Sequence, residues 1–364
     1  MKIICNRVEF LRAFQVAAPV APAKSNKDVL TKIKLEASDD GVVMMATDAD
    51  AGVRVSVEDV EVVKTGSALL DVIRVGSIFR ESRDEFIHVE VRKNSIHIIG
   101  DAGAFCLPAA NPDEFPSVVA ARSDDFFEID SLMLLELIKR TQFAIDCEST
   151  RYQLGGVCFS IDGESITAVA TDGRRMAVAK AAGCNHGIGS ASLVVPSKTL
   201  RLVEKSFIDG QKVRVSSSGG ILFSGNGCEI SSRLIDGRFP DWTKVIPVTE
   251  DMTEIRGGCG SFFSAIKQAS IVADPESRGV SFAFSNNLLV VAAKTADVGQ
   301  SRIETPIDYA GDDVAITMDY RFVGDFFRVL DSEKQFSVFV KNNSSPAVFS
   351  TDDGYTYVVM PMSK

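Results

Sequence analysis

The sequence lacks the motifs by which most enzymes are recognised. It contains no Gly-x-x-x-x-Gly-Lys-Ser/Thr loop, no Gly-x-Ser-x-Gly and no His-Glu-x-x-His, and it has only three histidines. His88 and His97 lie in strand-like runs and His186 lies in a glycine-rich segment, so we assign all three structural roles. The sequence therefore predicts no catalytic site.

Membrane spans and metal loops are absent as well. No apolar run approaches the roughly 18–20 residues of a spanning helix, and polar residues follow Met1 too early for a signal peptide. The seven cysteines include no Cys-x-x-Cys pair, which predicts reduced core thiols in a cytoplasmic protein. The segment Asp48–Gly52 lacks the later ligands of a calcium loop and is interpreted as a hairpin turn. We expect no metal and no cofactor.

What the sequence does contain is internal repetition with a period of 124 residues. Ala46-Thr47-Asp48 is followed 124 residues later by Ala170-Thr171-Asp172, and after another 124 residues by Lys294-Thr295. Each of these segments lies between two apolar runs with the composition of β-strands. We interpret the three copies as one hairpin used three times.

Amphipathic helices flank each hairpin, over residues 7–18, 71–82, 131–143, 197–208, 261–272 and 319–330. Asn6 and Glu9 have the spacing of a capping box, and Ile73 and Phe79 are predicted to face inward. Two alternating runs close each repeat, as at 86–91 and 95–99. The prediction is an α+β fold of three tandem domains, each with two helices packed on antiparallel β-sheets, at residues 1–121, 122–249 and 250–364.

Lysine and arginine recur on these helices. Lys198, Arg201 and Lys205 are three and four residues apart, which places them on one helix face, and Arg321 and Arg328 form a similar stripe. Such charges suit contact with phosphates without reading bases. The net charge of −10 does not exclude this, because net charge says little about a local surface. Ordinary solvated helix faces are the alternative, and the recurrence favours phosphate contact.

Four segments resemble the beta subunits of bacterial DNA polymerase III, the sliding clamps. They are Thr150–Val157, Ala170–Val178, Asp236–Trp242 and Tyr357–Met362, and the likeness follows the family's order along essentially the whole chain. It implies a non-enzymatic processivity factor that forms a ring as a head-to-tail homodimer, with twelve helices around double-stranded DNA. One cleft per subunit would bind peptides of the polymerase III alpha subunit, the clamp loader and other proteins that carry a clamp-binding motif.

The resemblance and the helix stripes together predict three sets of residues. The peptide-binding cleft is predicted to comprise Arg151, Leu154, Thr171, Gly173, Arg174, Arg175, Met176, Pro240, Lys244, Val245, Phe322, Val358, Val359, Met360, Pro361 and Met362. DNA contact is predicted for Lys24, Arg74, Arg80, Lys139, Arg140, Tyr152, Gln153, Lys198, Arg201, Lys205, Lys267, Arg321 and Arg328. The dimer interface is predicted at Phe105 and Leu107 of one subunit and at Ile271 and Val272 of the other.

Some cleft positions depart from the family's usual pattern. Gln153 stands where a second aromatic is frequent, Arg174 where a histidine is common, Lys244 replaces a frequent arginine and Phe322 lacks a tyrosine hydroxyl. These departures concern which peptides bind rather than whether a cleft exists. Two other functions remain open from the residues alone: a repeat scaffold that binds proteins without encircling DNA, and a hydrolase with a non-standard site.

Overall fold

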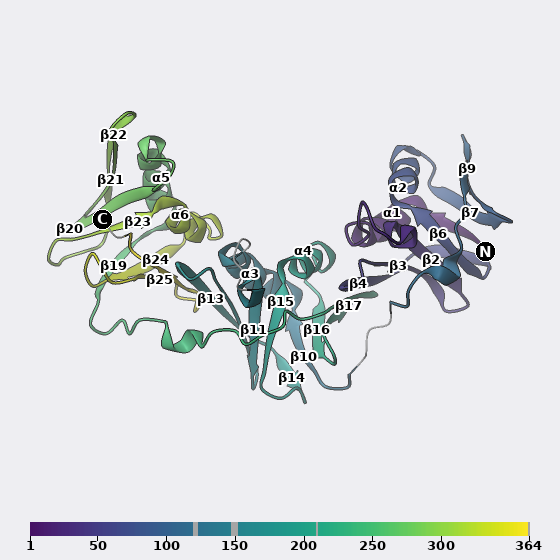
Figure 1. Cartoon of the computed structure of the whole chain (residues 1–364), viewed down its shortest axis with the longest axis horizontal. Coiled ribbons are helices and arrows are strands. Elements are labelled where there is room, and N and C mark those ends of the chain that lie inside the picture. The colour runs from purple at the N-terminus through teal and green to yellow at the C-terminus, as the bar shows by residue number, and fades with distance from the viewer. Residues whose placement is uncertain (119–122, 147–151, 209, 363–364) are drawn as a thin grey trace. The chain divides into compact units, whose positions relative to one another are not determined.

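The computed structural model describes residues 1–118, 123–146, 152–208 and 210–362. All pairings between its named strands are antiparallel, and the helices lie against the sheets in pairs, as α1 with α2 and α5 with α6 (Figure 1). The α+β class and the three tandem repeats predicted from the sequence are confirmed. No helix in the described part of the chain is long and apolar enough to cross a membrane.

The first repeat begins with β1 (Lys2–Asn6) and α1 (Arg7–Ala17). Its remaining elements are β2 (Lys32–Ser38), β3 (Gly41–Thr47), β4 (Ala51–Val57), β5 (Val60–Lys64), β6 (Gly66–Asp71), α2 (Val72–Glu81), β7 (Phe86–Arg92), β8 (Ser95–Ile99) and β9 (Ala104–Pro108).

Local sequence explains both helices of this repeat. The Asn6 side chain accepts the N–H groups of Val8 and Glu9, which begins α1 as predicted. The other half of the predicted capping box is absent, because the Glu9 carboxylate pairs with Arg12 at 3.0 Å. The α1 core residue Phe10 stacks on Phe79 of α2 with ring centroids 4.0 Å apart.

The predicted inward orientation of Ile73 was wrong. Its side chain is 80% exposed, whereas Val75, Gly76 and Phe79 are buried. Gly76 permits a close approach of the two helices, since a Cβ there would lie 3.1 Å from the Phe14 ring. The buried face of α2 therefore contains Val75, Gly76 and Phe79 and excludes Ile73.

The second repeat reuses the same order of elements, and in the described residues the third reuses it with four strands between its helices where the first two have five. The second contains β10 (Phe126–Asp130), α3 (Ser131–Thr141), β11 (Gly156–Asp162), β12 (Ser165–Thr171), β13 (Arg175–Ala182), β14 (Cys184–His186), β15 (Ala191–Pro196), α4 (Ser197–Ser206), β16 (Lys212–Ser217), β17 (Ile221–Gly225) and β18 (Cys228–Ser232). The third contains β19 (Thr253–Gly258), α5 (Cys259–Ala269), β20 (Gly279–Ser285), β21 (Leu288–Thr295), β22 (Gly299–Pro306), β23 (Val314–Asp319), α6 (Tyr320–Arg328), β24 (Gln335–Val340), β25 (Ala347–Ser350) and β26 (Thr356–Val359).

Two of the four sheets run across repeat boundaries. The strand orders are β5-β1-β7-β8-β9, β14-β10-β16-β17-β18-β4-β3-β2-β6, β15-β11-β12-β13-β26-β25-β24-β19 and β22-β21-β20-β23. We call the β4–β18 pairing the first junction and the β13–β26 pairing the second junction. The described strands β9 and β22 each stand at the edge of a sheet.

Because of these shared sheets, the chain forms two compact units that divide the second repeat. One unit contains residues 1–135, 183–188 and 198–234, and the other contains residues 136–182, 189–197 and 235–364. Each unit thus holds one complete repeat, one junction and part of the second repeat. The domain boundaries at residues 121 and 249 stay predictions.

Four of the predicted core thiols are buried: Cys5, Cys158, Cys228 and Cys259. Burial raises the pKa of Cys5 and of Cys228 to about 12, which keeps both as unreactive thiols. Cys106 and Cys184 are exposed, contrary to the prediction. Cys147 lies outside the described residues.

Candidate peptide cleft and helix surfaces

A fixed turn connects β12 to β13 at the predicted cleft. The Thr171 hydroxyl donates to the Arg175 carbonyl at 2.6 Å and accepts the Gly173 N–H at 3.0 Å. The Asp172 carboxylate accepts the N–H groups of Arg174 and Arg175. Gly173 has φ = +84°, a conformation that favours glycine. The turn leaves the Arg174 side chain exposed and directs that of Arg175 inward.

The Arg175 guanidinium links the second repeat to the third. Its Nε lies 3.0 Å from Asp172 Oδ2, its Nη1 lies 2.5 Å from Asp325 Oδ2 on α6, and its Nη2 donates to the Phe143 carbonyl at 2.7 Å. The group also lies over the Phe322 ring, 4.4 Å from its centroid. Three of its contacts are therefore charge-assisted or hydrogen-bonded, as a buried cation requires.

The side chain of Arg175 is only 10% exposed. Burial opposes its charge, but the neighbouring Tyr357 and Asp325 raise the pKa of Arg175 above its ordinary value. The guanidinium therefore stays charged. In the predicted cleft, Arg175 lies on the buried side of the wall.

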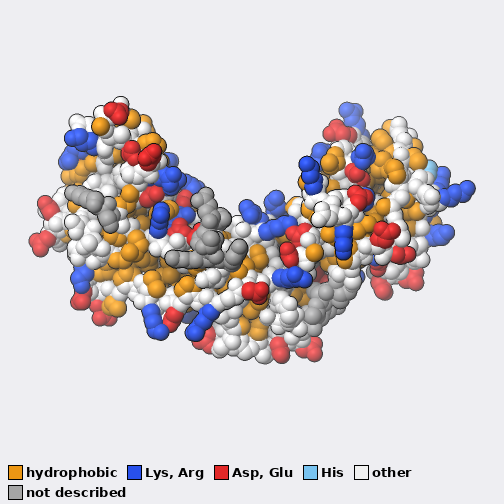
Figure 2. Space-filling model, in the orientation of Figure 1, with side chains coloured by type: hydrophobic (Ala, Val, Ile, Leu, Met, Phe, Trp, Pro, Cys, Tyr) orange, Lys and Arg blue, Asp and Glu red, His pale blue; other side chains and the backbone are white. Residues whose placement is uncertain are grey.

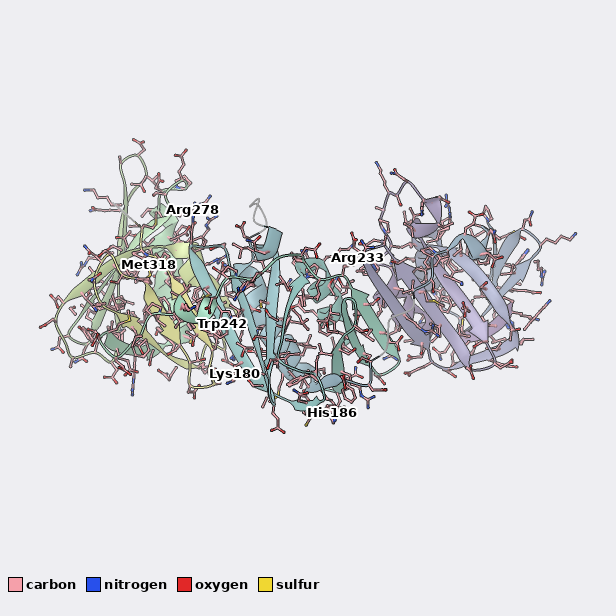
Figure 3. All side chains as sticks on the ribbon, turned by 60° about the horizontal axis from the view of Figure 1, so that its bottom comes forward. Lys180, His186, Arg233, Trp242, Arg278 and Met318 are labelled. Atoms are coloured by element: carbon pink, nitrogen blue, oxygen red, sulfur yellow. The ribbon has the colours of Figure 1, made fainter. Side chains whose placement is uncertain are left out.

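The floor of the predicted cleft is apolar. Leu154, Met176 and Val358 are 3–4% exposed and belong to one cluster with Phe239. Trp242, which Figure 3 labels, packs against this cluster and is partly buried. The apolar floor is continuous with the core of the second junction.

Val359 does not contribute to this floor. It is fully buried and lies outside the cluster that contains Val358. Adjacent residues of a strand point to opposite faces, so Val359 shares a face with Tyr357 and not with Val358. The Tyr357 hydroxyl donates a hydrogen bond to the Phe322 carbonyl of α6. Val358 therefore supplies the apolar surface that the sequence assigned to Val359.

The rim of the predicted cleft consists of exposed and half-buried residues. Arg151 lies outside the described residues. The exposed members are Gly173, Arg174, Pro240, Lys244, Val245 and Met360, and the half-buried ones are Thr171, Phe322, Pro361 and Met362. Lys244 pairs with Asp241 at 2.7 Å.

The chain after β26 crosses to the neighbouring sheet. The Met360 N–H bonds to the Arg174 carbonyl at 2.9 Å, and the Met362 N–H bonds to the Thr317 carbonyl on β23 at 2.8 Å. The Met362 sulfur lies over Gly279, where a Cβ would be 3.4 Å away. These contacts place Met360 and Met362 along the rim, and Gly279 and Thr317 beneath them are residues that the sequence did not reveal.

On α4 the predicted basic stripe has the expected geometry. Lys198, Arg201 and Lys205 are exposed, and Leu200 and Val203 on the opposite face are buried. Figure 2 shows Lys and Arg side chains gathered over this helix. Lys198 forms an ion pair with Asp48 across the first junction. The stripe is therefore a solvent-facing cationic surface, and Lys198 within it has a carboxylate partner.

The remaining basic positions divide into exposed and engaged side chains. Lys24, Arg74, Arg80, Lys139, Lys267 and Arg328 are exposed, and Arg321 and Gln153 are half-buried. The Tyr152 side chain lies outside the described part of the chain. Arg140 differs from the exposed group: it is 11% exposed and binds Glu136 and Asp353 at 2.6 and 2.7 Å. Its contacts are those of a structural residue.

Both predicted halves of the dimer interface lie on surfaces. Phe105 and Leu107 lie on the edge strand β9, with Phe105 48% exposed. A cavity of about 450 Å³, lined by Ile78, Ile98 and Phe105 among others, adjoins that strand. Ile271 is 77% exposed in a short 3-10 helix, Ser270–Val272. Sequence reasoning did not find the cavity, because its walls come from α2, β7 and β8.

Comparison with known proteins identifies the family. The sequence matches the N-terminal domain of the DNA polymerase III beta subunit over residues 1–119, the central domain over 128–241 and the C-terminal domain over 243–363. The chain belongs to the DNA polymerase III beta subunit family. This is a family of non-catalytic processivity subunits, which agrees with the sequence-based prediction that the protein is not an enzyme.

Relatives and solved structures match over the full length. The chain is 26% identical to the beta sliding clamp of Pseudomonas aeruginosa and 25% identical to that of Escherichia coli K12, and covers 100% of each protein. It also superposes on the DNA polymerase sliding clamp of Bacillus subtilis with a TM-score of 0.93 at 24% identity, with 100% of this chain and 99% of that chain covered.

Proposed function

We propose that this protein is a DNA sliding clamp, in which two copies close into a ring around duplex DNA and hold the replicative polymerase through the cleft at the second junction. Membership of the beta subunit family supports this function, and the relatives named above are beta sliding clamps. We place the protein in the cytoplasm, in contact with DNA, with the polymerase III alpha subunit, with the clamp loader and with other proteins that carry clamp-binding motifs.

One observation supports the ring: the same strand pairing occurs at both junctions, and it leaves β9 and β22 as complementary sheet edges. The second hairpin strand of repeat one, β4, pairs with the last strand of repeat two, β18. The equivalent strand β13 pairs with β26, the last strand of repeat three. By the same rule, β22 of one copy pairs with β9 of another. A head-to-tail dimer satisfies both edges at once.

The repeat also predicts the register of that contact. Gly52 stands opposite Ser231 at the first junction. Two periods after Gly52 is Gln300 on β22 (52 + 2 × 124). The strand registers pair Ile3 with Val89, Ile98 and Phe105 in turn, and pair the equivalent Phe127 with Val215, Phe223 and Ile230, so Phe105 is the equivalent of Ile230 and Cys106 that of Ser231. We infer that Gln300 faces Cys106 of the partner subunit. This register places Phe105 opposite Ser301 and brings the exposed apolar edge of β9 into the interface.

The exposed cations suit contacts with DNA that do not hold the protein at one position along the duplex. Lys198, Arg201 and Lys205 on α4, with Arg328 on α6, present exposed point charges on helices. Phosphate contacts of this kind are independent of sequence and depend strongly on salt. A ring held by its closure can therefore slide while it remains on the duplex.

The ring is tested by its topology. We expect sedimentation to give a mass near twice 39.3 kDa. Protein loaded onto circular DNA should be retained and should be lost when the circle is cut. A dimer that leaves circular and linear DNA equally fast would contradict the proposal and favour a scaffold that binds proteins without encircling DNA.

A further inference from the structure

The two junctions share their backbone contacts residue by residue. At the second junction the Met360 N–H bonds to the Arg174 carbonyl at 2.9 Å. At the first junction the Arg233 N–H bonds to the Asp50 carbonyl, also at 2.9 Å. Asp50 and Arg174 are one period of 124 residues apart and lie in turns with the same Thr and Asp hydrogen bonds. The first junction therefore serves as an internal reference for the cleft.

Side chains at these equivalent positions differ in one respect. At the first junction Asp50 and Arg233 form an ion pair, with the Arg233 Nη1 3.4 Å from the Asp50 carboxylate (Figure 3 labels Arg233). At the second junction the pair is replaced by Arg174 and Met360, a cation beside an apolar residue. Within the described residues, no carboxylate contacts the Arg174 side chain. An ion pair is therefore present at the first junction, whereas the second junction has only its cation, Arg174, among the described residues.

Arg174 is also held in a position to meet a ligand. Its N–H is fixed by the Asp172 carboxylate, and the following Arg175 is anchored inside the wall by Asp325. Met360, exposed by 45%, extends the apolar surface at its side. Lys244, the other described cation of the rim, is already paired with Asp241. A ligand's carboxylate would thus find its partner at Arg174.

We propose that the cleft selects peptides that carry a carboxylate next to their apolar anchors, and that Arg174 is the residue that reads this carboxylate. The anchors pack on the floor of Leu154, Met176 and Val358, and the ligand's acidic side chain pairs with Arg174, which gives the second junction a cation–carboxylate pair like that of Arg233 and Asp50 at the first. This inference rests on the proposed cleft and adds its charge preference.

The experiment compares matched peptides by calorimetry on the full-length protein. Short synthetic peptides with a Leu and a Phe anchor carry a Glu on either flank, and their controls carry Gln at the same place. We expect one Glu peptide to bind about two- to five-fold more tightly than its Gln control, as for an exposed ion pair, with the difference shrinking as salt rises.

Two substitutions separate charge from shape. Arg174→Gln should remove the preference for Glu while the Gln peptide keeps its affinity, because the turn is held by the backbone N–H of residue 174. Arg174→Glu should reverse the preference toward a Lys peptide. Arg233→Gln, at the equivalent contact of the first junction, is the matched control and should leave the preference unchanged.

The outcomes distinguish this inference from the proposed function. Equal affinity for Glu and Gln peptides, or an equal loss for both in Arg174→Gln, would overturn the role of Arg174 while leaving the cleft intact. Binding of neither peptide to the unchanged protein would contradict the proposed cleft and the inference with it.

Discussion

Arg175 and Asp325 form an ion pair that joins the second repeat to the third, with 2.5 Å between Arg175 Nη1 and Asp325 Oδ2. The two residues are 150 positions apart in sequence and their side chains are 10% and 14% exposed. The other Asp325 oxygen binds Arg328, a candidate DNA contact, at 2.5 Å. One carboxylate on α6 is thus shared between the inner wall of the cleft and the exposed helix surface.

Removal of this carboxylate should loosen the second junction. In Asp325→Asn the buried Arg175 keeps Asp172 but loses its partner on α6, and we expect a cost of about 2–4 kcal/mol, less than for a fully isolated buried charge. Hydrogen exchange should show faster opening of β26 and β13. Asp352→Asn, an exposed carboxylate on the same repeat, is the control. Unchanged protection of both strands would show that the pair contributes little.

Gly52 should tolerate no side chain while Val118 is present. A Cβ at Gly52 would lie 2.7 Å from Val118 Cγ1, and a β-branched valine is stiff about χ1, the one torsion that could move this methyl aside. We expect Gly52→Ala to destabilise the first junction by about 1–3 kcal/mol and to lower the melting temperature. The double variant Gly52→Ala/Val118→Ala should recover most of the loss. Failure of the second change to compensate would refute a local clash.

The α4 stripe should govern the association with DNA. Replacing Lys198, Arg201 and Lys205 by Ala removes three cations from one face, and association with DNA should weaken and become less sensitive to salt. A control variant with the same change in net charge replaces the exposed Lys64, Lys93 and Lys212, which lie on strands and a turn. Equal effects of the two variants on the salt slope would indicate a general charge effect instead of a helix surface.

Ile271→Asp should prevent dimer formation. The side chain is 77% exposed in one chain, and a carboxylate buried against Phe105 and Leu107 of the partner subunit would have no compensating charge. We expect sedimentation to give monomers of 39.3 kDa. Val248→Asp, at an exposed valine outside the proposed interface, should remain dimeric. A stable Ile271→Asp dimer would contradict the proposed interface.

Asp319 should make stability depend on pH. Burial raises the pKa of Asp319 to about 6, although Arg278 opposes the shift. The folded protein therefore retains a proton that the unfolded chain, with a pKa of about 3.9, has already lost. The stabilising contribution is complete below about pH 4 and disappears as the pH rises through about 6.

Asp319→Asn isolates that effect, because an asparagine can still accept the Arg321 N–H that begins α6. We expect the melting temperature of the variant relative to the unchanged protein to increase from pH 4 to pH 7, by at most the equivalent of about 3 kcal/mol. A constant difference over this range, or one that decreases, would show that Asp319 ionises normally in the folded state.

Much of the local structure could be predicted because apolar and polar residues alternate with the short periods of strands and helices. The alternation in 86–91 and 95–99 became β7 and β8, and the helical spacing of Lys198, Arg201 and Lys205 placed them together on α4. Errors arose where a periodic pattern allows two phases. Ile73 and Phe79 are both apolar, and so are Val358 and Val359. Only packing could decide that Phe79 and not Ile73 is buried, and that Val358 and not Val359 belongs to the cleft floor.

By itself, the sequence determined three repeats, their helices and hairpins, and the turn that presents Arg174, because these depend on neighbours within a few residues. The tertiary structure alone decided that β4 pairs with β18 and β13 with β26, more than 170 positions away along the chain. It also decided that Arg140 forms ion pairs with Glu136 and Asp353, while Arg174 has no carboxylate partner among the described residues. Strand register and ion pairing across such separations depend on which surfaces meet after folding, and no local pattern records that.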